Sequence, residues 1–327
     1  MTRRGRLTSA VALATPVLLL AACGSSGSSS ESESESLTLY TCVSDTTIEP
    51  MIDGFESDHP GTSVDLYRAP TGELNARVAG DVRSGGLRAD VVWGCDPLTV
   101  QDYVDQGLVG GWTPSTPIPA EYRTDDYVGV ALLYLVSVTG KGVPPPASWS
   151  DLAGPAYQPV AVPDPGLAAS ALGALGFFAG DPDYGLGYYD DLKRNGATQV
   201  STPDDVVTGV AEGTYAAGIT IANSAYAATE NGSPIEVTWP APGAIAVYGP
   251  IAIAADTENE AAAKDFISFV ASRDGQELLA KSGSYPTLPG VPGPTKPDDA
   301  PIVTPDWAEL ATQKDSLLAQ YQKIFGG

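Results

Sequence analysis

The sequence predicts an α/β protein built as two lobes, and three observations support this fold class. Short apolar runs typical of strands alternate with amphipathic segments typical of helices, which indicates parallel sheets in three-layer αβα units. Two longer apolar runs, at residues 127–138 and 244–254, enclose a middle segment with the same alternation. A segment inserted into another domain through two strands forms a second lobe, so we expect two hinge crossings.

The first lobe is predicted to comprise residues 37–132 and 249–284, and the second lobe residues 133–248 and 285–327. In the first lobe, strands are expected at residues 37–42, 63–67 and 89–93, with helices at 45–57, 71–82 and 98–106. Asp45 is predicted to be the N-cap of the first helix. In the second lobe, strands are expected at residues 160–162, 216–221 and 234–239, with helices at 166–178, 186–193, 204–212 and 223–231. Further helices are expected at residues 259–272, 276–281 and 307–325, the last of them in the second lobe.

Composition excludes several classes of function. The 327 residues include 17 Lys and Arg against 40 Asp and Glu, for a net charge of -23. Such a chain is unsuited to nucleic acid or to an anionic membrane surface, because both require a basic face. The chain has one histidine, His59, and contains neither a Gly-x-Ser-x-Gly elbow nor a Walker loop. We therefore expect a protein that is not an enzyme and needs no cofactor.

The N-terminus has the features of an export signal. Three arginines within residues 1–6 precede an apolar run at residues 7–22, which is too short for a transmembrane helix. The run ends in Leu20-Ala21-Ala22-Cys23, which resembles a bacterial lipobox. We expect a lipoprotein signal peptide over residues 1–22, lipidation of Cys23, and a Gly/Ser/Glu tether over residues 23–36. The alternative is an ordinary secretory cleavage site beside an incidental cysteine. Lipidation predicts an exported protein anchored to the outer face of the cytoplasmic membrane.

Two cysteines remain in the body of the chain, Cys42 and Cys95. Each follows a predicted strand, and neighbouring parallel strands bring their carboxyl ends to one edge of a sheet. An exported compartment is oxidising, so the pair is a disulfide candidate, with two free buried thiols as the alternative.

Several phrases of the chain resemble one known family. The run Leu37–Thr41, the phrase Arg68–Val78 and the run Ala89–Asp96 resemble the first lobe of ABC-importer solute-binding proteins of the ferric-ion and phosphonate type. Trp149–Leu152 and Gly218–Thr220 resemble later landmarks of that family. The resemblance implies the type II periplasmic-binding-protein fold, a Venus flytrap whose lobes close on a solute. It also implies delivery of a small-molecule solute to an ABC permease and its ATPase, and we expect a monomer.

The expected solute is a small anion such as a phosphonate or an organophosphate. Its oxygens require backbone N–H groups, hydroxyls and helix N-termini, and such groups follow the predicted strands. The candidate binding residues are Thr41, Ser44, Thr71, Gly72, Asp96, Ser170, Asn223, Ser224 and Tyr226.

Two departures from the family keep alternatives open. Relatives carry a Ser-Gly-Thr phrase where this chain has Ala168-Ala169-Ser170, which removes one hydroxyl. Ferric members carry two adjacent tyrosines where this chain has Asn223-Ser224. A ferric-iron site would have to use Tyr226, Glu73 and Asp96, a poor set for a cation that prefers several hard anionic ligands. A non-transport adhesive surface lipoprotein is the alternative from another class.

Overall fold

The computed structural model describes residues 35–326. The predicted signal peptide, Cys23 and most of the predicted tether lie outside these residues. The last two residues of that tether, Glu35 and Ser36, instead open strand β1 (Glu35–Thr41), and the Ser36 hydroxyl donates to Asp65 Oδ2 at 2.7 Å. Within the described residues, no helix combines the length and apolar character needed to cross a membrane.

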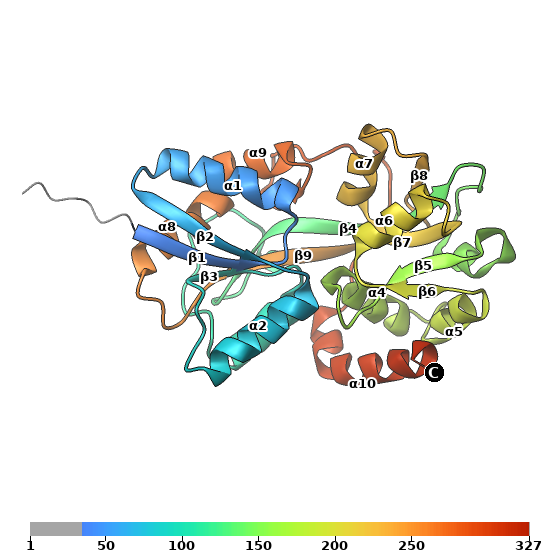
Figure 1. Ribbon diagram of the computed structural model, residues 1–327, viewed down its shortest axis with the longest axis horizontal. Helices are drawn as coiled ribbons and strands as arrows, with labels where there is room; N and C mark the ends of the chain where they lie inside the picture. Colours follow the sequence, from blue (N-terminus) through green and yellow to red (C-terminus); the bar gives the residue numbers. More distant parts are fainter. Residues whose placement is uncertain (1–34, 327) are drawn as a thin grey trace, which may run out of the picture. The chain divides into compact units, whose positions relative to one another are not determined.

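One continuous path of strands runs through both lobes in the order β2-β1-β3-β9-β4-β7-β5-β6 (Figure 1). The strands other than β1 are β2 (Thr62–Arg68), β3 (Val91–Trp93), β4 (Val128–Gly140), β5 (Val160–Pro163), β6 (Thr198–Val200), β7 (Ala217–Ile221), β8 (Ile235–Thr238), β9 (Ala244–Ile253), β10 (Tyr285–Pro286) and β11 (Ile302–Val303). Strand β1 pairs in parallel with β2 and β3, and β5 pairs in parallel with β6 and β7. The long strands β4 and β9 pair antiparallel between these two parallel sets. They are the two hinge crossings that the sequence predicts.

Helices cover both faces of the first parallel set. They are α1 (Asp45–Asp58), α2 (Thr71–Arg83), α3 (Pro97–Asp105), α8 (Glu260–Ala271) and α9 (Arg273–Lys281). The alternation along β1 decides which side chain meets which layer. Leu37 and Leu39 pack with Phe55 of α1 and Phe266 of α8, whereas Tyr40 packs on the opposite face with Leu74 of α2. This first lobe is therefore a three-layer αβα unit.

The second lobe repeats this arrangement around β7, β5 and β6. Its helices are α4 (Ala169–Gly180), α5 (Gly187–Arg194), α6 (Pro203–Ala211), α7 (Ala222–Glu230) and α10 (Trp307–Phe325). Val160 and Val162 of β5 face the core under α4, α5 and α10, while Ala161 between them faces Val206 of α6. Helix α10 contacts α4 and α5, so it packs on the second lobe.

Two local features differ from the sequence prediction. Ser44 is the N-cap of α1, with extended backbone at φ -61° and ψ 149°, and Asp45 is the first helical residue. The first lobe also extends past residue 284. The amide oxygen of Gln276 accepts hydrogen bonds from the backbone N–H groups of Thr287 and Leu288, at 2.9 and 3.2 Å, and Leu288 lies in the core of that lobe. The buried amide of Gln276 therefore holds the chain at Thr287 and Leu288 on the first lobe, beyond the predicted boundary at residue 284.

Candidate functional site

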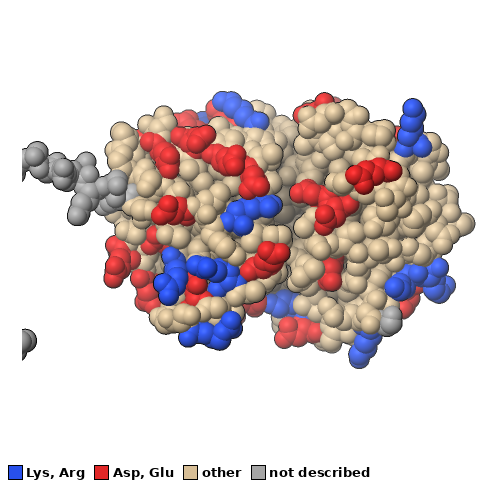
Figure 2. Space-filling view, in the orientation of Figure 1, with Lys and Arg blue, Asp and Glu red and all other residues tan. Residues whose placement is uncertain are grey.

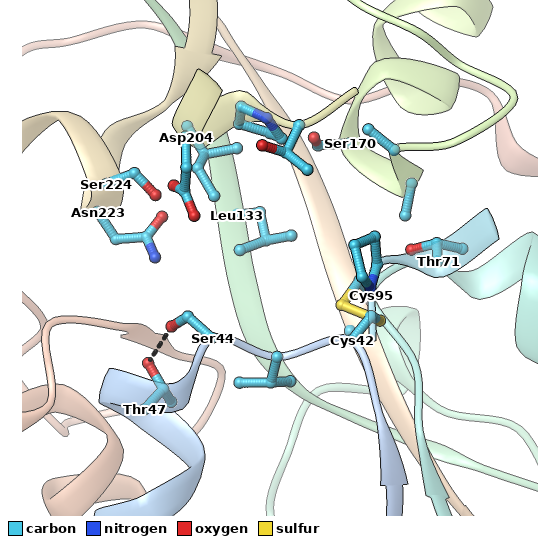
Figure 3. A pocket seen from close by; sticks show the side chains of 18 of the residues that line it. Cys42, Ser44, Thr47, Thr71, Cys95, Leu133, Ser170, Asp204, Asn223 and Ser224 are labelled. Carbon is cyan, nitrogen blue, oxygen red and sulfur yellow. Dashed lines mark hydrogen bonds between the residues drawn. A yellow bond between two sulfur atoms is a disulfide. The ribbon is translucent and has the colours of Figure 1, made fainter. Parts of the chain in front are cut away.

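A cavity of about 230 Å³ lies between the two lobes and takes its lining from both. Figure 2 shows that the surface is hollowed where the lobes meet. The polar side chains of the lining are mostly hydroxyls, together with one amide, one guanidinium and one carboxylate. They are Ser44, Thr47, Arg68, Thr71, Ser170, Ser201, Thr202, Asp204, Asn223, Ser224 and Ser284. Trp93, whose indole Nε1 has no hydrogen-bond partner within the described residues, also lines the cavity. Figure 3 labels Ser44, Thr47, Thr71, Ser170, Asp204, Asn223 and Ser224 among these residues. Apolar groups such as Leu133 and Leu167 complete the walls.

Helix N-termini that lack a side-chain cap begin at this cavity. The N-cap residues of α2, α4 and α7 are Pro70, Ala168 and Ile221, and none of these side chains can accept a hydrogen bond. Polar residues are strongly preferred at this position because they satisfy the free N–H groups of the first turn. Ser44 of α1, which has a hydroxyl, also makes no side-chain cap and bonds the hydroxyls of Thr46 and Thr47 instead.

Four other helices of the described chain have a side-chain cap, and one of them, α6, also begins at the cavity. Asp96, Thr202, Ser272 and Asp306 cap α3, α6, α9 and α10 through side-chain hydrogen bonds. Helices α5 and α8 are uncapped but begin away from the cavity. The cavity thus receives positive helix-dipole ends, and N–H groups that no side chain caps, from several helices at once. The N–H of Gly72 in α2 is an exception, because it donates to the carbonyl of Leu167 at 3.1 Å.

The cavity contains two charged side chains of opposite sign. The Arg68 Nε donates to the carbonyl of Val43 at 3.1 Å and lies 3.8 Å from Asp45 Oδ1. This contact holds the guanidinium at the first-lobe wall. Asp204 lies on the second-lobe side in the first turn of α6, and its carboxylate forms no ion pair with any residue from 35 to 326.

A disulfide between Cys42 and Cys95 forms part of the first-lobe wall. The S–S distance is 2.09 Å and the Cα atoms are 6.0 Å apart. The bond joins the turn after β1 to the turn after β3. These two strands are parallel neighbours, as the predicted disulfide requires.

Five of the predicted binding residues line the cavity: Ser44, Thr71, Ser170, Asn223 and Ser224. They come from the N-termini of α1, α2, α4 and α7, as strand-to-helix connections in α/β sheets provide. Thr41, Gly72, Asp96 and Tyr226 do not line it.

Thr41 and Asp96 have structural partners instead. The Thr41 hydroxyl donates to the carbonyl of Trp93 at 2.8 Å and accepts from the N–H of Val43 at 3.0 Å. Asp96 Oδ1 accepts from the N–H of Thr99 at 2.8 Å and caps α3, while Oδ2 is buried without a partner. Burial raises the pKa of the Asp96 carboxyl above its usual range, against the hydrogen bonds from Thr99 and the nearby charge of Lys314.

The residues considered for ferric iron do not converge. The Tyr226 hydroxyl accepts from Trp239 Nε1 at 2.9 Å, Glu73 is exposed on α2, and Asp96 is buried at the start of α3. Across residues 35–326, no three or more His, Cys, Asp or Glu side chains form a group suited to a metal ion.

The sequence prediction missed Arg68, Thr47, Ser201, Thr202, Asp204 and Ser284. Arg68 ends a parallel strand, which is a usable signal for a ligand-facing cation. Asp204 looks in the sequence like any acidic residue in the first turn of a helix, so the sequence does not single it out. Ser284 follows α9, and it reaches the cavity through the packing of that part of the chain.

Residues 37–284 match the family model described as bacterial extracellular solute-binding protein. The chain belongs to this family. It is an extracellular solute-binding protein of the ABC-importer type.

Curated relatives of this solute-binding protein are named as binding proteins for polyamines. It is 29% identical over 160 residues to the spermidine/putrescine-binding periplasmic protein of Escherichia coli (strain K12), a match that covers 46% of each chain. The corresponding protein of Salmonella typhimurium is 30% identical over 146 residues, covering 43% of this chain and 42% of that one. This chain therefore spans somewhat under half the length of the curated relatives it matches.

Solved structures agree on the fold. The periplasmic binding protein AfuA from Actinobacillus pleuropneumoniae, with exogenous fructose-6-phosphate bound, matches with a TM-score of 0.80 at 18% identity, covering 89% of this chain and 99% of that one. Iron-bound HitA from Pseudomonas aeruginosa matches with a TM-score of 0.75, also at 18% identity, covering 88% and 99%. At this identity the likeness establishes the two-lobed periplasmic-binding-protein fold.

Proposed function

We propose that this solute-binding protein captures a small organic oxyanion, of the phosphate-ester or phosphonate class, in the cavity between its lobes. The observation that carries the proposal is the convergence of the uncapped N-termini of α2, α4 and α7 on that cavity. Free N–H groups at a helix N-terminus are a ready anion site, because the amides donate hydrogen bonds and the helix dipole favours negative charge.

The side chains of the lining support the same class of solute. Hydroxyls such as Thr71 and Ser170 donate to oxyanions without adding charge, and Arg68 adds one formal positive charge. The net charge of the chain is -23, but binding depends on the local field, and the lining contains a single carboxylate.

Cationic solutes suit this cavity less well. A polyamine requires several carboxylates, and the lining offers Asp204 alone, with Arg68 in the same cavity. Ferric iron requires several anionic ligands, and no tyrosine lines the cavity.

The finer localisation is part of the proposal. The basic start, the short apolar run and Leu20-Ala21-Ala22-Cys23 support export with residues 1–22 as a lipoprotein signal peptide. Lipidation of Cys23 would anchor the protein to the outer face of the cytoplasmic membrane, and it would act there as a monomer. Intact-mass measurement of the membrane-extracted protein tests this. The mass of a diacylated chain beginning at Cys23 is expected, and an unmodified soluble chain would contradict it.

A thermal-shift and calorimetry panel tests the solute class. Glycerol 3-phosphate, phosphonoacetate and inorganic phosphate are compared with ferric citrate, putrescine and spermidine. A bound solute at one hundred times its Kd stabilises the folded state by about 2.7 kcal/mol, so a clear rise in Tm is expected with the phosphorylated probes. A rise with polyamines alone, or a visible charge-transfer band with ferric iron, would replace the proposal. A flat panel would favour an adhesive surface lipoprotein.

A further inference from the structure

One side of the cavity presents hydrogen-bond acceptors that have no donor. Asp204 lies in the first turn of α6 and Asn223 in the first turn of α7, and Figure 3 shows the two side chains close together beside Ser224. Asn223 Oδ1 is buried without a hydrogen-bond partner. An unpaired buried acceptor costs free energy, so a donor that reaches this oxygen from the cavity would stabilise the complex.

Asp205, and not Asp204, makes the side-chain hydrogen bonds that cap helix α6. Asp205 Oδ2 accepts from the N–H of Thr202 at 2.9 Å, and the Thr202 hydroxyl accepts from the N–H of Asp205 at 3.1 Å. This capping box satisfies two N–H groups at the start of α6 without the carboxylate of Asp204. The carboxylate of Asp204 is left exposed at the cavity, with no ion pair among the residues that the structure describes.

The opposite side of the cavity has the reverse character. Thr71 and Ser170 lie there, across the view from Asp204 and Asn223 (Figure 3). They belong to the uncapped helices α2 and α4, and Arg68 ends the strand that leads into α2. The uncapped N-termini of α2 and α4 therefore lie toward one end of the cavity, and the carboxylate of Asp204 and the amide oxygen of Asn223 lie toward the other, where α7 also begins. The guanidinium of Arg68 lies beside Val43 and Asp45 at the start of α1.

We propose that the solute has two chemically different ends: an oxyanion held at α2 and α4, and a hydrogen-bond-donating group, hydroxyl or ammonium, held by Asp204 and Asn223. This inference rests on the proposed function and narrows it. A plain oxyanion with an apolar tail leaves the acceptor end unpaired. A solute that donates at this end satisfies both side chains, and an ammonium group also neutralises Asp204.

Three phosphate monoesters of matched size test the two-ended solute. Propyl phosphate has an apolar end, glycerol 3-phosphate adds two hydroxyls to the same carbon chain, and 2-aminoethyl phosphate replaces the terminal methyl by an ammonium group. Their Kd values are measured by calorimetry on the full chain and on the variant Asp204→Asn. Asp274→Asn is the matched control, because Asp274 is also an exposed aspartate in a first turn, that of α9, away from the cavity.

We expect at least one donor-bearing ester to bind about tenfold or more tightly than propyl phosphate, the usual range for a hydrogen bond to a charged group. Asp204→Asn is expected to remove that advantage, read as the ratio of the Kd of propyl phosphate to the Kd of the favoured ester, while Asp274→Asn leaves this ratio as it is in the unmodified protein. Tighter binding of glycerol 3-phosphate would identify the donor group of the solute as a hydroxyl, and tighter binding of 2-aminoethyl phosphate would identify it as an ammonium. Equal Kd values for the three esters, or an equal loss for all in Asp204→Asn, overturn the two-ended solute and leave the proposed function standing. If none of the three binds, the proposed function fails and this inference fails with it.

Discussion

The backbone N–H of Gly72 donates to the carbonyl oxygen of Leu167 at 3.1 Å, and this bond joins the first lobe to the second at the edge of the cavity. Gly72 is in the first turn of α2, and Leu167 lies just before α4. A Cβ on Gly72 would lie 2.9 Å from Leu167 Cδ2 and 3.3 Å from the carbonyl oxygen of Gly166. Gly72, a binding residue in the sequence prediction, lies outside the lining of the cavity and makes this contact between the lobes.

Substituting Gly72 by alanine is expected to weaken solute binding without unfolding the protein. The added methyl pushes Leu167 away and opposes the approach of the lobes, on which solute affinity depends. We expect the Kd of the best phosphate ester to rise about tenfold, which corresponds to a loss of about 1.4 kcal/mol in the free energy of binding. Calorimetry gives the Kd, and small-angle scattering with solute shows whether the lobes still close.

Gly80→Ala is the matched control for this prediction. It lies in the same helix, and its added Cβ would contact only Arg83 Nη2, at 3.9 Å. Binding should be unchanged, and stability should rise by up to about 1 kcal/mol from the helix propensity of alanine. The double variant Gly72→Ala, Leu167→Ala should recover affinity. If Gly72→Ala binds as tightly as the unmodified protein, the interlobe contact has no part in closure.

Ala168 offers a variant in which stability and binding change in opposite directions. It is the N-cap of α4 and lines the cavity, with backbone at φ -112° and ψ 117° that a capping residue can adopt. Ala168→Ser and Ala168→Asp should each cap α4 and stabilise the empty protein by about 1 kcal/mol. Both occupy the free N–H groups, and the aspartate also repels an anion.

Affinity for a phosphate ester should therefore fall modestly in Ala168→Ser and more than tenfold in Ala168→Asp, by analogy with lost charge-assisted hydrogen bonds of about 1.5–3 kcal/mol. Denaturant unfolding without solute and calorimetry with solute measure the two effects separately. Unchanged affinity in Ala168→Asp would show that the α4 N-terminus does not hold the anion.

Loss of the disulfide is expected to destabilise the first lobe. Cys42 and Cys95 are separated by 53 residues, and closing a loop of this length lowers the entropy of the unfolded chain by an amount worth about 4 kcal/mol. The variant Cys42→Ser, Cys95→Ser should show a correspondingly lower free energy of unfolding in urea. Reductant should lower the stability of the unmodified protein to that of the variant and leave the variant unaffected. Equal stability with and without reductant would mean that the bond adds nothing.

The buried carboxyl of Asp96 predicts a pH dependence of stability. Its folded-state pKa is raised by burial, so its contribution is fully present below the unfolded pKa of about 3.9 and is lost as the pH rises through the folded value. Asp96→Asn keeps an oxygen to accept from Thr99 but cannot ionise. The Tm of Asp96→Asn minus that of the unmodified protein should therefore become more positive from pH 4 to pH 7.

The difference in Tm at pH 3 serves as the reference, because both side chains are neutral there. It measures the effect of replacing a carboxylic acid by an amide without any ionisation. A difference that stays constant from pH 3 to pH 7 would show that ionisation of Asp96 costs the fold nothing.

Much of the fold follows from local patterns. The alternation in Leu37–Thr41 predicts a strand with two buried faces, and the predicted final helix at residues 307–325 coincides with α10. Local patterns were least informative at element ends. Ser44 and Asp45 are both good capping residues, and the choice between them depends on how the preceding turn packs.

The candidate site was predicted in part, for a physical reason. Ser44, Thr71, Ser170, Asn223 and Ser224 directly follow strands or begin helices, and such positions face a common edge in α/β sheets. Thr41 and Asp96 occupy similar positions in the sequence. Their side chains turn instead toward Trp93 and Thr99, because a nearer backbone partner was available.

The sequence by itself determined the two-lobed α/β architecture, the acidic chain and the order of strands and helices, because these depend on periodicity and composition within short windows. Tertiary structure decided which helix starts share one cavity, and which of two adjacent aspartates caps a helix while the other lines the cavity. That choice depends on groups far apart in the chain, such as Thr71 and Ser170, meeting in space, and no local pattern encodes their distance.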